Sequence, residues 1–254
     1  MSDITKHLSN ILRFSTMAKK NSETFVPFPL IVVDKPHGIS SMTVVRILRR
    51  VLKPVKITKV GYAGTLDPYA TGVLIVGVGR EGTRQLGSLT DKDKEYECEI
   101  DLLKNSYSGD MEDFKQEYQM EIPQGMKIPD IDQIKHLIDT RFCGKIQQVP
   151  PHLSAIKVNG QKSCDMVRKG IEIELKERTV TVYKQEILRY EFPVLRLRIK
   201  CSKGTYIRTL GQDIGKALGL WGTLVSLRRT MCGDHTINDA LILDKITLSD
   251  LGTI

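Results

Sequence analysis

The sequence lacks the features that mark several protein classes. Its five cysteines are odd in number and form no CxxC pair, which argues against a disulfide framework and a structural zinc site and fits a reducing compartment. The five histidines form no HxH, HxxxH or HExxH spacing, so nothing supports a metal hydrolase or a Ser–His–Asp hydrolase. The longest nearly apolar run, residues 72–79, is far shorter than the ~20 residues of a membrane helix, so we expect no membrane span.

What remains is the composition of a globular protein with an uneven charge. The 254 residues are 41% hydrophobic and 27% charged, and this length suits one large domain or two small ones. The net charge is +8, yet residues 91–121 hold eleven acidic residues against four lysines, a local −7 that leaves +15 for the rest of the chain. A chain that is basic outside one acidic segment is typical of a protein with a polyanionic partner. Many basic proteins, however, bind no polyanion.

Residues 1–24 are predicted to form a basic, disordered extension ahead of one domain over residues 25–254. The extension lacks the apolar core of a secretory signal, but its arginine, lysine and serine residues leave an organellar presequence open. We therefore expect a cytoplasmic protein, with an organellar matrix as the alternative.

Apolar periodicity predicts an α+β fold. Helical spacing covers about 42–53, with Ser40 or Ser41 as N-cap, and recurs at 130–142 and 206–218. Residues 96–102 alternate strictly, as in a half-buried antiparallel strand. Further strands are predicted at 29–33, 72–78, 154–158, 178–190 and 194–201. We therefore expect a mixed, mainly antiparallel sheet with flanking helices.

The stretch GYAGTLDPYATGVL, residues 61–74, holds the first chemical candidate. Its glycines permit unusual backbone angles, and Pro68 stiffens the chain directly after Asp67. An aspartate on such a loop can act as a nucleophile or a general base. Taken alone, an Asp-Pro turn whose carboxylate only satisfies backbone amides is the commoner explanation. The GVGREG stretch at 77–82 lacks GxGxxG and P-loop spacing, so no phosphate loop is predicted there.

Three other stretches carry candidate residues, either as partners of an active-site aspartate or for contacts with a nucleic acid. The candidates are Lys203, Tyr206 and Arg208 in one stretch, Arg228 and Arg229 in a second, and Tyr96 in a third. Arginine can grip a carboxylate with two parallel hydrogen bonds or bind phosphates, and a tyrosine ring can stack on a splayed base. Each also has a plainer explanation, as an exposed arginine, a basic strand end or a core aromatic.

Six sequence blocks, taken in order, closely resemble one family. The blocks are LIVVDKPHGISS, GYAGTLDPYATGVL, DKEYECEIDL, QVPPHLSAIKVNGQK, CSKGTYIRTLGQDIG and SLRRT. Together they resemble the TruB family of tRNA pseudouridine synthases over about residues 28–245. The order of six blocks is far more specific than any single block.

The resemblance implies a role for each candidate. Asp67 matches the catalytic aspartate, Arg208 the arginine that pairs with it, and Tyr96 the tyrosine that stacks on the target base and is assigned a part in proton removal at C5. Tyr206 and Leu227 match residues that line the pocket for the flipped uridine. We assign substrate binding to Tyr62, Tyr206, Leu227, Lys35, Lys203, Arg228 and Arg229.

The resemblance also implies the fold and the reaction. We expect a sheet of the pseudouridine synthase type, and a monomer that converts uridine 55 in the T-stem-loop of tRNA to pseudouridine with no cofactor or metal. Asp67 would promote cleavage of the N1–C1′ bond, either by attack on the sugar or by removal of a sugar proton, before the uracil rejoins through C5. A non-catalytic RNA-binding protein, and a synthase with another target or a guide RNA, stay open as alternatives.

Some positions depart from the family pattern. Tyr62 stands where a histidine that helps to displace tRNA bases is usual, so Tyr62 is predicted to stack instead. His152 and Leu153 occupy places where an aromatic is frequent, and Cys164 replaces a frequent tyrosine. The chain ends at Ile254, so we expect no C-terminal PUA domain of the kind many relatives carry. These departures bear on RNA docking and leave the chemistry at Asp67 unchanged.

Overall fold

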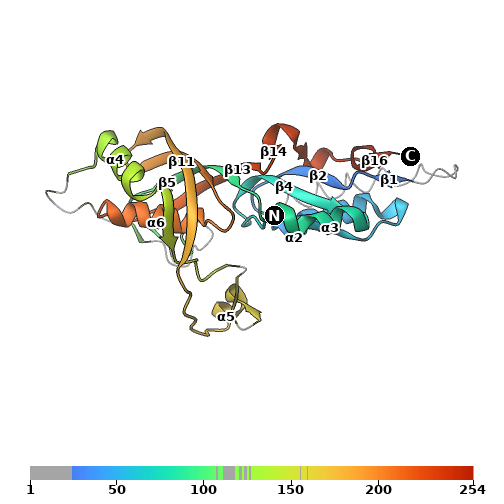
Figure 1. Ribbon diagram of the computed structural model, residues 1–254, viewed down its shortest axis with the longest axis horizontal. Helices are drawn as coiled ribbons and strands as arrows, with labels where there is room; N and C mark the ends of the chain where they lie inside the picture. Colours follow the sequence, from blue (N-terminus) through green and yellow to red (C-terminus); the bar gives the residue numbers. More distant parts are fainter. Residues whose placement is uncertain are drawn as a thin grey trace. The chain divides into compact units, whose positions relative to one another are not determined.

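The chain forms two compact units, each built around its own strands (Figure 1). The computed structural model describes residues 25–106, 108–110, 118–119, 122, 125, 127–154, 156–158 and 160–253. The first unit comprises the described residues of 1–91 and 234–254, and the second those of 92–233. The predicted disordered extension, residues 1–24, lies outside the described residues.

The first unit contains short strands, two helices and several 3-10 turns. Its elements are β1 (Val26–Pro27), β2 (Leu30–Lys35), α2 (Ser41–Val51), η2 (Lys53–Val55), β3 (Val60–Ala63), β4 (Thr71–Val78), α3 (Gly79–Thr90), β14 (His235–Thr236), η3 (Ile237–Asp239), β15 (Leu241–Ile242), η4 (Leu243–Lys245), η5 (Leu248–Leu251) and β16 (Gly252–Thr253). Strand β4 pairs antiparallel with both β2 and β3, and β15 runs parallel to β2. The near-continuous apolar run of β4 is buried, as expected of a strand covered on both faces.

Helix α2 follows from its amphipathic pattern. The Ser40 Oγ accepts a hydrogen bond from the Thr43 N–H at 3.1 Å, which confirms Ser40 as the N-cap. Val44, Val45 and Leu48 are fully buried and form the core-facing stripe. The arginines of α2 occupy the exposed side, as the spacing predicted.

The start of α3 depends on glycine. A Cβ on Gly82 would lie 1.8 Å from the Pro29 carbonyl oxygen, and one on Gly77 would lie 2.6 Å from the Gly82 carbonyl oxygen. The same Pro29 carbonyl accepts the Val78 N–H at 3.0 Å. The stretch 77–82 therefore closes β4 and opens α3 with backbone against backbone, an approach only glycine allows.

The second unit contains the long strands. Its elements are β5 (Lys94–Asp101), β6 (Lys104–Asn105), β7 (Tyr118–Gln119), α4 (Ile131–Arg141), β8 (Gly144–Gln148), β9 (Lys157–Val158), β10 (Gln161–Lys162), α5 (Ser163–Arg168), β11 (Arg178–Glu191), β12 (Val194–Cys201), α6 (Ile207–Ala217) and β13 (Thr223–Cys232). Five strands pair antiparallel in the order β13-β5-β12-β11-β8. The α+β, mainly antiparallel architecture is confirmed.

Helices α6 and α4 pack on this sheet. Gly211 of α6 lies against Ile100 of β5 and Leu224 of β13, so the helix covers the face on which the alternating residues of β5 are buried. Helix α4 buries Ile134 and Ile138, and it begins at a capping box formed by Asp130 and Gln133. No helix of the described residues is both long and apolar enough to span a membrane.

Most predicted elements are found at the predicted places, and the differences are local. The strand predicted at 154–158 is confined to Lys157–Val158, and several elements were not predicted. The longest of these are α3, β13, α5 and β8. Helix α3 buries only Gly82 and Leu89, so it lacks the apolar stripe by which helices are recognised.

We expect Gly82→Ala to lower the free energy of unfolding by about 3 kcal/mol or more, because the new methyl group must displace the Pro29 backbone. Gly87→Ala in the same helix is the matched control: its Cβ meets nothing within 4 Å, so the helix should gain about 0.5–1 kcal/mol. Urea unfolding of the two variants measures both values, and equal stabilities would contradict the close approach at Gly82.

Candidate active site

Asp67 lies on the loop between β3 and β4, and a buried lysine holds this loop. The Lys35 side chain is fully buried, and its Nζ donates to the carbonyls of Pro36, Ile39 and Pro68 at 2.9, 2.7 and 3.0 Å. An ammonium out of water must find such acceptors. One acceptor belongs to Pro68, the residue directly after Asp67, so Lys35 fixes the loop that carries Asp67. Its predicted contact with substrate stays a prediction.

A second buried side chain fixes the loop on the other side of Asp67. The Ser41 Oγ accepts from the Leu66 N–H at 3.0 Å and donates to the Leu66 carbonyl at 2.9 Å. The Asp67 carbonyl accepts from the Ala70 N–H at 3.1 Å, which closes the Asp-Pro turn. The backbone of Asp67 is therefore held from both neighbours, as a rigidly presented catalytic side chain requires.

Tyr96 is the buried tyrosine of β5. It lies between Ile199 of β12 and Arg229 of β13 in the sheet register, and Arg229 is only 1% exposed. Burial raises the pKa of Tyr96 to about 12, although the charge of Arg229 and its hydrogen bond to the phenol act in the opposite direction. Tyr96 is thus a neutral phenol at physiological pH, with Arg229 placed to lower the cost of a phenolate.

Arg208 lies in the first turn of α6 and is 4% exposed. Its Nη1 donates to the Ser108 carbonyl at 3.0 Å and pairs with Asp110 Oδ2 at 3.4 Å, while Nη2 donates to the Leu153 carbonyl at 2.8 Å. Asp110 was counted in the acidic segment of the sequence but was not singled out. The pairing of Arg208 with Asp67 stays a prediction.

The remaining predicted residues are distributed over both units. Tyr206 precedes α6, and Lys203 is exposed in the turn before it. Leu227 is buried beside Cys98, and Arg228 is half-buried at a register position opposite Glu97. In the first unit, Tyr62 is half-buried on β3. Residue chemistry alone marked Lys203, Tyr206 and Arg228 as candidates, whereas Tyr62 and Leu227 were assigned only through the family resemblance.

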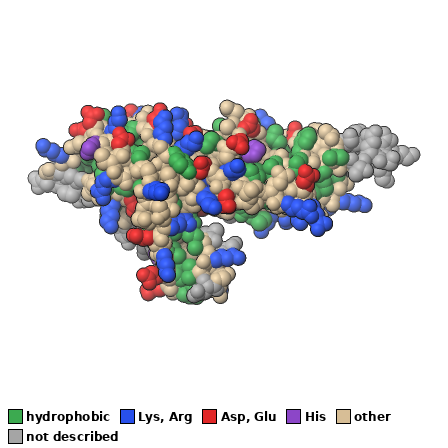
Figure 2. Space-filling view, viewed as in Figure 1, with side chains coloured by type: hydrophobic (Ala, Val, Ile, Leu, Met, Phe, Trp, Pro, Cys, Tyr) green, Lys and Arg blue, Asp and Glu red, His purple; other side chains and the backbone are tan. Residues whose placement is uncertain are grey.

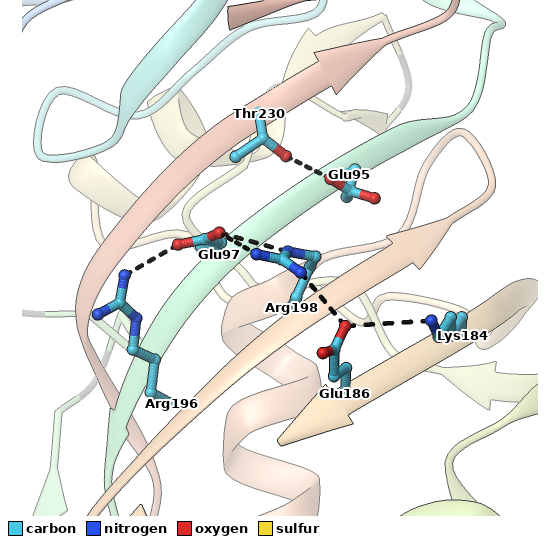
Figure 3. Close-up of polar contacts among 7 residues, drawn as sticks. All are labelled: Glu95, Glu97, Lys184, Glu186, Arg196, Arg198 and Thr230. Carbon is cyan, nitrogen blue, oxygen red and sulfur yellow. Dashed lines mark hydrogen bonds and ion pairs between the residues drawn. The ribbon is translucent and has the colours of Figure 1, made fainter. Parts of the chain in front are cut away.

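An ion-pair ladder covers the sheet face that carries Glu97 (Figure 3). Glu97 pairs with Arg196 and Arg198, both at 2.9 Å, and these guanidinium groups hold the pKa of Glu97 below its ordinary value. Arg198 also pairs with Glu186 at 3.3 Å, and Glu186 with Lys184 at 4.0 Å. Exposed pairs of this kind contribute little to stability. They do leave Arg196 and Arg198 already neutralised by protein carboxylates.

Comparison with known proteins identifies the family. Residues 49–207 match the TruB family pseudouridylate synthase N-terminal domain. The chain belongs to this TruB family. TruB relatives include the tRNA pseudouridine synthase B of Francisella philomiragia, 41% identical over 219 residues (85% of this chain, 69% of the relative). That of Chlamydia abortus is 38% identical over 218 residues (85% of this chain, 88% of the relative).

The TruB chain is also similar to solved structures. A crystal structure of a Cbf5–Nop10–Gar1 complex matches with a TM-score of 0.62 and 29% identity, covering 87% of this chain and 57% of that chain. A structure of an H/ACA RNP bound to a substrate RNA containing 2′-deoxyuridine matches with a TM-score of 0.61 and 26% identity, covering 90% of this chain and 58% of that chain. These matches confirm the pseudouridine synthase type of fold.

The raised pKa of Tyr96 predicts a pH-dependent loss of stability. Because the folded-state pKa of about 12 lies above the unfolded value of 10.0, the stability contributed by the neutral phenol is present below pH 10 and is lost as pH rises through 12. We expect wild type to lose up to about 3 kcal/mol more than Tyr96→Phe across this window. Urea unfolding between pH 9 and pH 11.5 measures the start of this divergence, and parallel curves would contradict the buried phenol.

Proposed function

We propose that the chain, acting as a monomer, is a tRNA pseudouridine synthase that converts uridine 55 of the T-stem-loop to pseudouridine. Membership of the TruB family supports this proposal, as do relatives named tRNA pseudouridine synthase B at 38–41% identity. The observation that carries it is the loop of Asp67, whose flanking backbone is held by the buried side chains of Lys35 and Ser41. Such fixation suits a side chain that must meet a sugar carbon at one position.

The proposed reaction begins with a uridine flipped out of its stack, at a cost of a few kcal/mol. Asp67 then promotes cleavage of the N1–C1′ bond by attack on the sugar or by removal of a sugar proton, and the uracil turns and rejoins through C5. Tyr96 offers its neutral ring for stacking, and Arg208 is the proposed partner of Asp67. One bond replaces another and C5 loses the proton that N1 gains, so the isomerisation balances without a redox partner.

The first unit offers a basic surface for the phosphates of the RNA. Helix α2 and the turn after it expose Arg46, Arg50, Lys53, Lys56 and Lys59. No acidic residue occurs between Lys35 and Leu66, so nothing in this stretch neutralises them. By contrast, acidic and basic side chains are interspersed over the second unit (Figure 2). We call the five α2-side residues the α2 basic surface, and propose that it contacts phosphates.

Guided modification is the weaker alternative. The solved Cbf5 and H/ACA structures are 26–29% identical to this chain, whereas relatives named tRNA pseudouridine synthase B reach 41%. The closer likeness is therefore to synthases named for tRNA. A non-catalytic RNA-binding role is disfavoured by the fixed loop around Asp67.

Asp67→Asn should nearly abolish tritium release from a tRNA transcript labelled at uridine C5, while tRNA binding stays within a fewfold of wild type. The change is almost isosteric but removes the charge that the chemistry needs. Asp132→Asn, on the exposed side of α4, is the matched control and should leave release unchanged. Wild-type release from the Asp67 variant would rule out its catalytic role, and no release from wild-type enzyme would rule out the proposed activity.

The affinity for tRNA should fall steeply with salt, with the α2 basic surface responsible for part of the slope. Replacing Arg46, Arg50 and Lys53 together by glutamine should lower the log–log slope by about 2–3, since each phosphate contact contributes about 0.7–0.9. Replacing Arg196 and Arg198 by glutamine is the control: both are already paired with Glu97, so the slope should hardly change. Filter binding at several salt concentrations gives both slopes, and equal effects would refute the assignment.

A further inference from the structure

A buried amide in the second unit binds the backbone of one functional residue twice. Gln148, the last residue of β8, is 1% exposed. Its Nε2 donates to the Tyr206 carbonyl at 3.0 Å, and its Oε1 accepts from the Tyr206 N–H at 2.8 Å. The side chain thus takes the place of a neighbouring strand for a single residue. A buried side chain that both donates a hydrogen bond to one residue and accepts another from it fixes the position of that residue.

Arg178, which pairs with Gln148 across the sheet, contacts the ring of Tyr206. Arg178 of β11 is the register partner of Gln148. Its Cζ lies 4.8 Å from the centroid of the Tyr206 ring, and its Nη2 donates to the Gly204 carbonyl. A guanidinium over a tyrosine face at this distance makes a cation–π contact. One cross-strand pair therefore holds Tyr206 by its backbone and by its ring.

The start of α6 needs this support because its N-cap residue cannot cap the helix. Tyr206 occupies the N-cap, and its side chain makes no capping hydrogen bond. The residues that follow are bound to the segment after Gln148: the Thr209 Oγ1 donates to the Val149 carbonyl at 3.4 Å, and Arg208 donates to the Leu153 carbonyl. The first turn of α6, which carries Arg208, is thus attached to the end of β8 and the chain beyond it.

We propose that Gln148 and Arg178 are positioning residues for the reaction. Gln148 sets the backbone of Tyr206, Arg178 sets its ring, and together they hold the first turn of α6 so that Tyr206 and Arg208 are in place before RNA binds. Neither residue is proposed to touch the substrate. The inference rests on the proposed function for its catalytic consequence, while its structural consequence can be measured without any activity.

The test uses the full chain and a tRNA transcript tritiated at uridine C5, with enzyme in excess. Gln148→Met removes both hydrogen bonds at similar volume, and should lower the single-turnover rate at saturating tRNA by about 10- to 100-fold. The dissociation constant for tRNA should change less than threefold, because affinity comes mainly from phosphate contacts elsewhere. Arg178→Met should lower the rate in the same way. Rates within twofold of wild type for both variants would overturn the proposal, as would an affinity loss that accounts for the whole effect.

Gln147→Met is the matched control. Gln147 is the adjacent residue on β8, is exposed, and binds only the Thr179 hydroxyl among its described partners, at 3.0 Å. Its rate should stay within twofold of wild type; an equal loss would show that any change on β8 has this effect and would overturn the proposal. If Gln148→Met does not fold, Gln148→Glu takes its place, since it keeps the acceptor for the Tyr206 N–H and loses the donor to the carbonyl.

A second measurement separates this proposal from the proposed function. Amide hydrogen exchange in Gln148→Met should become at least tenfold faster over residues 206–210 and stay unchanged in β5. This result would stand even if wild-type enzyme released no tritium, an outcome that would count against the proposed function alone. Unchanged exchange over residues 206–210 would overturn the positioning role of Gln148 whatever the activity.

Discussion

Buried positive charge is the constraint on which the functional region depends. Lys35, Arg208 and Arg229 are 0%, 4% and 1% exposed, and each cation loses solvation worth several kcal/mol. Hydrogen bonds and ion pairs within the protein replace this solvation. Lys35 donates to three backbone carbonyls, and Arg208 donates to two carbonyls and pairs with Asp110. Arg229 forms a hydrogen bond with the Tyr96 phenol. The acceptors at Pro68, Ser108 and Leu153 lie in loops that are far from Lys35 and Arg208 in sequence, so satisfying these two charges also fixes the loops.

The fold could largely be predicted from periodicity, and the failure to predict helix α3 has a physical cause. Helices α2, α4 and α6 each bury an apolar stripe, and β5 alternates, so these elements are visible in the sequence. Helix α3 buries too few side chains to leave such a stripe, since its contact with the first unit's core is made by backbone at Gly82. A contact made by backbone atoms alone leaves no apolar periodicity in the sequence. The glycines of the stretch 77–82 were considered only as a phosphate loop.

The site was harder to predict than the fold. Asp67 stood out because a proline and glycines surround it, yet its role required the resemblance of six ordered blocks. Asp110 and Gln148 could not be predicted, because their partners, Arg208 and Tyr206, lie 98 and 58 residues away and no local pattern marks them. Buried polar partnerships are decided by tertiary structure, and a single sequence records only their residue types.

The ion-pair ladder on β5, β11 and β12 affects how the stability of the second unit depends on temperature. It joins five charges, Arg196, Glu97, Arg198, Glu186 and Lys184, on one exposed sheet face. Since the hydration of charged groups becomes less favourable as temperature rises, the cost of bringing such charges together falls on warming, while hydrophobic stabilisation levels off. The second unit therefore carries a network whose share of the folding free energy grows with temperature.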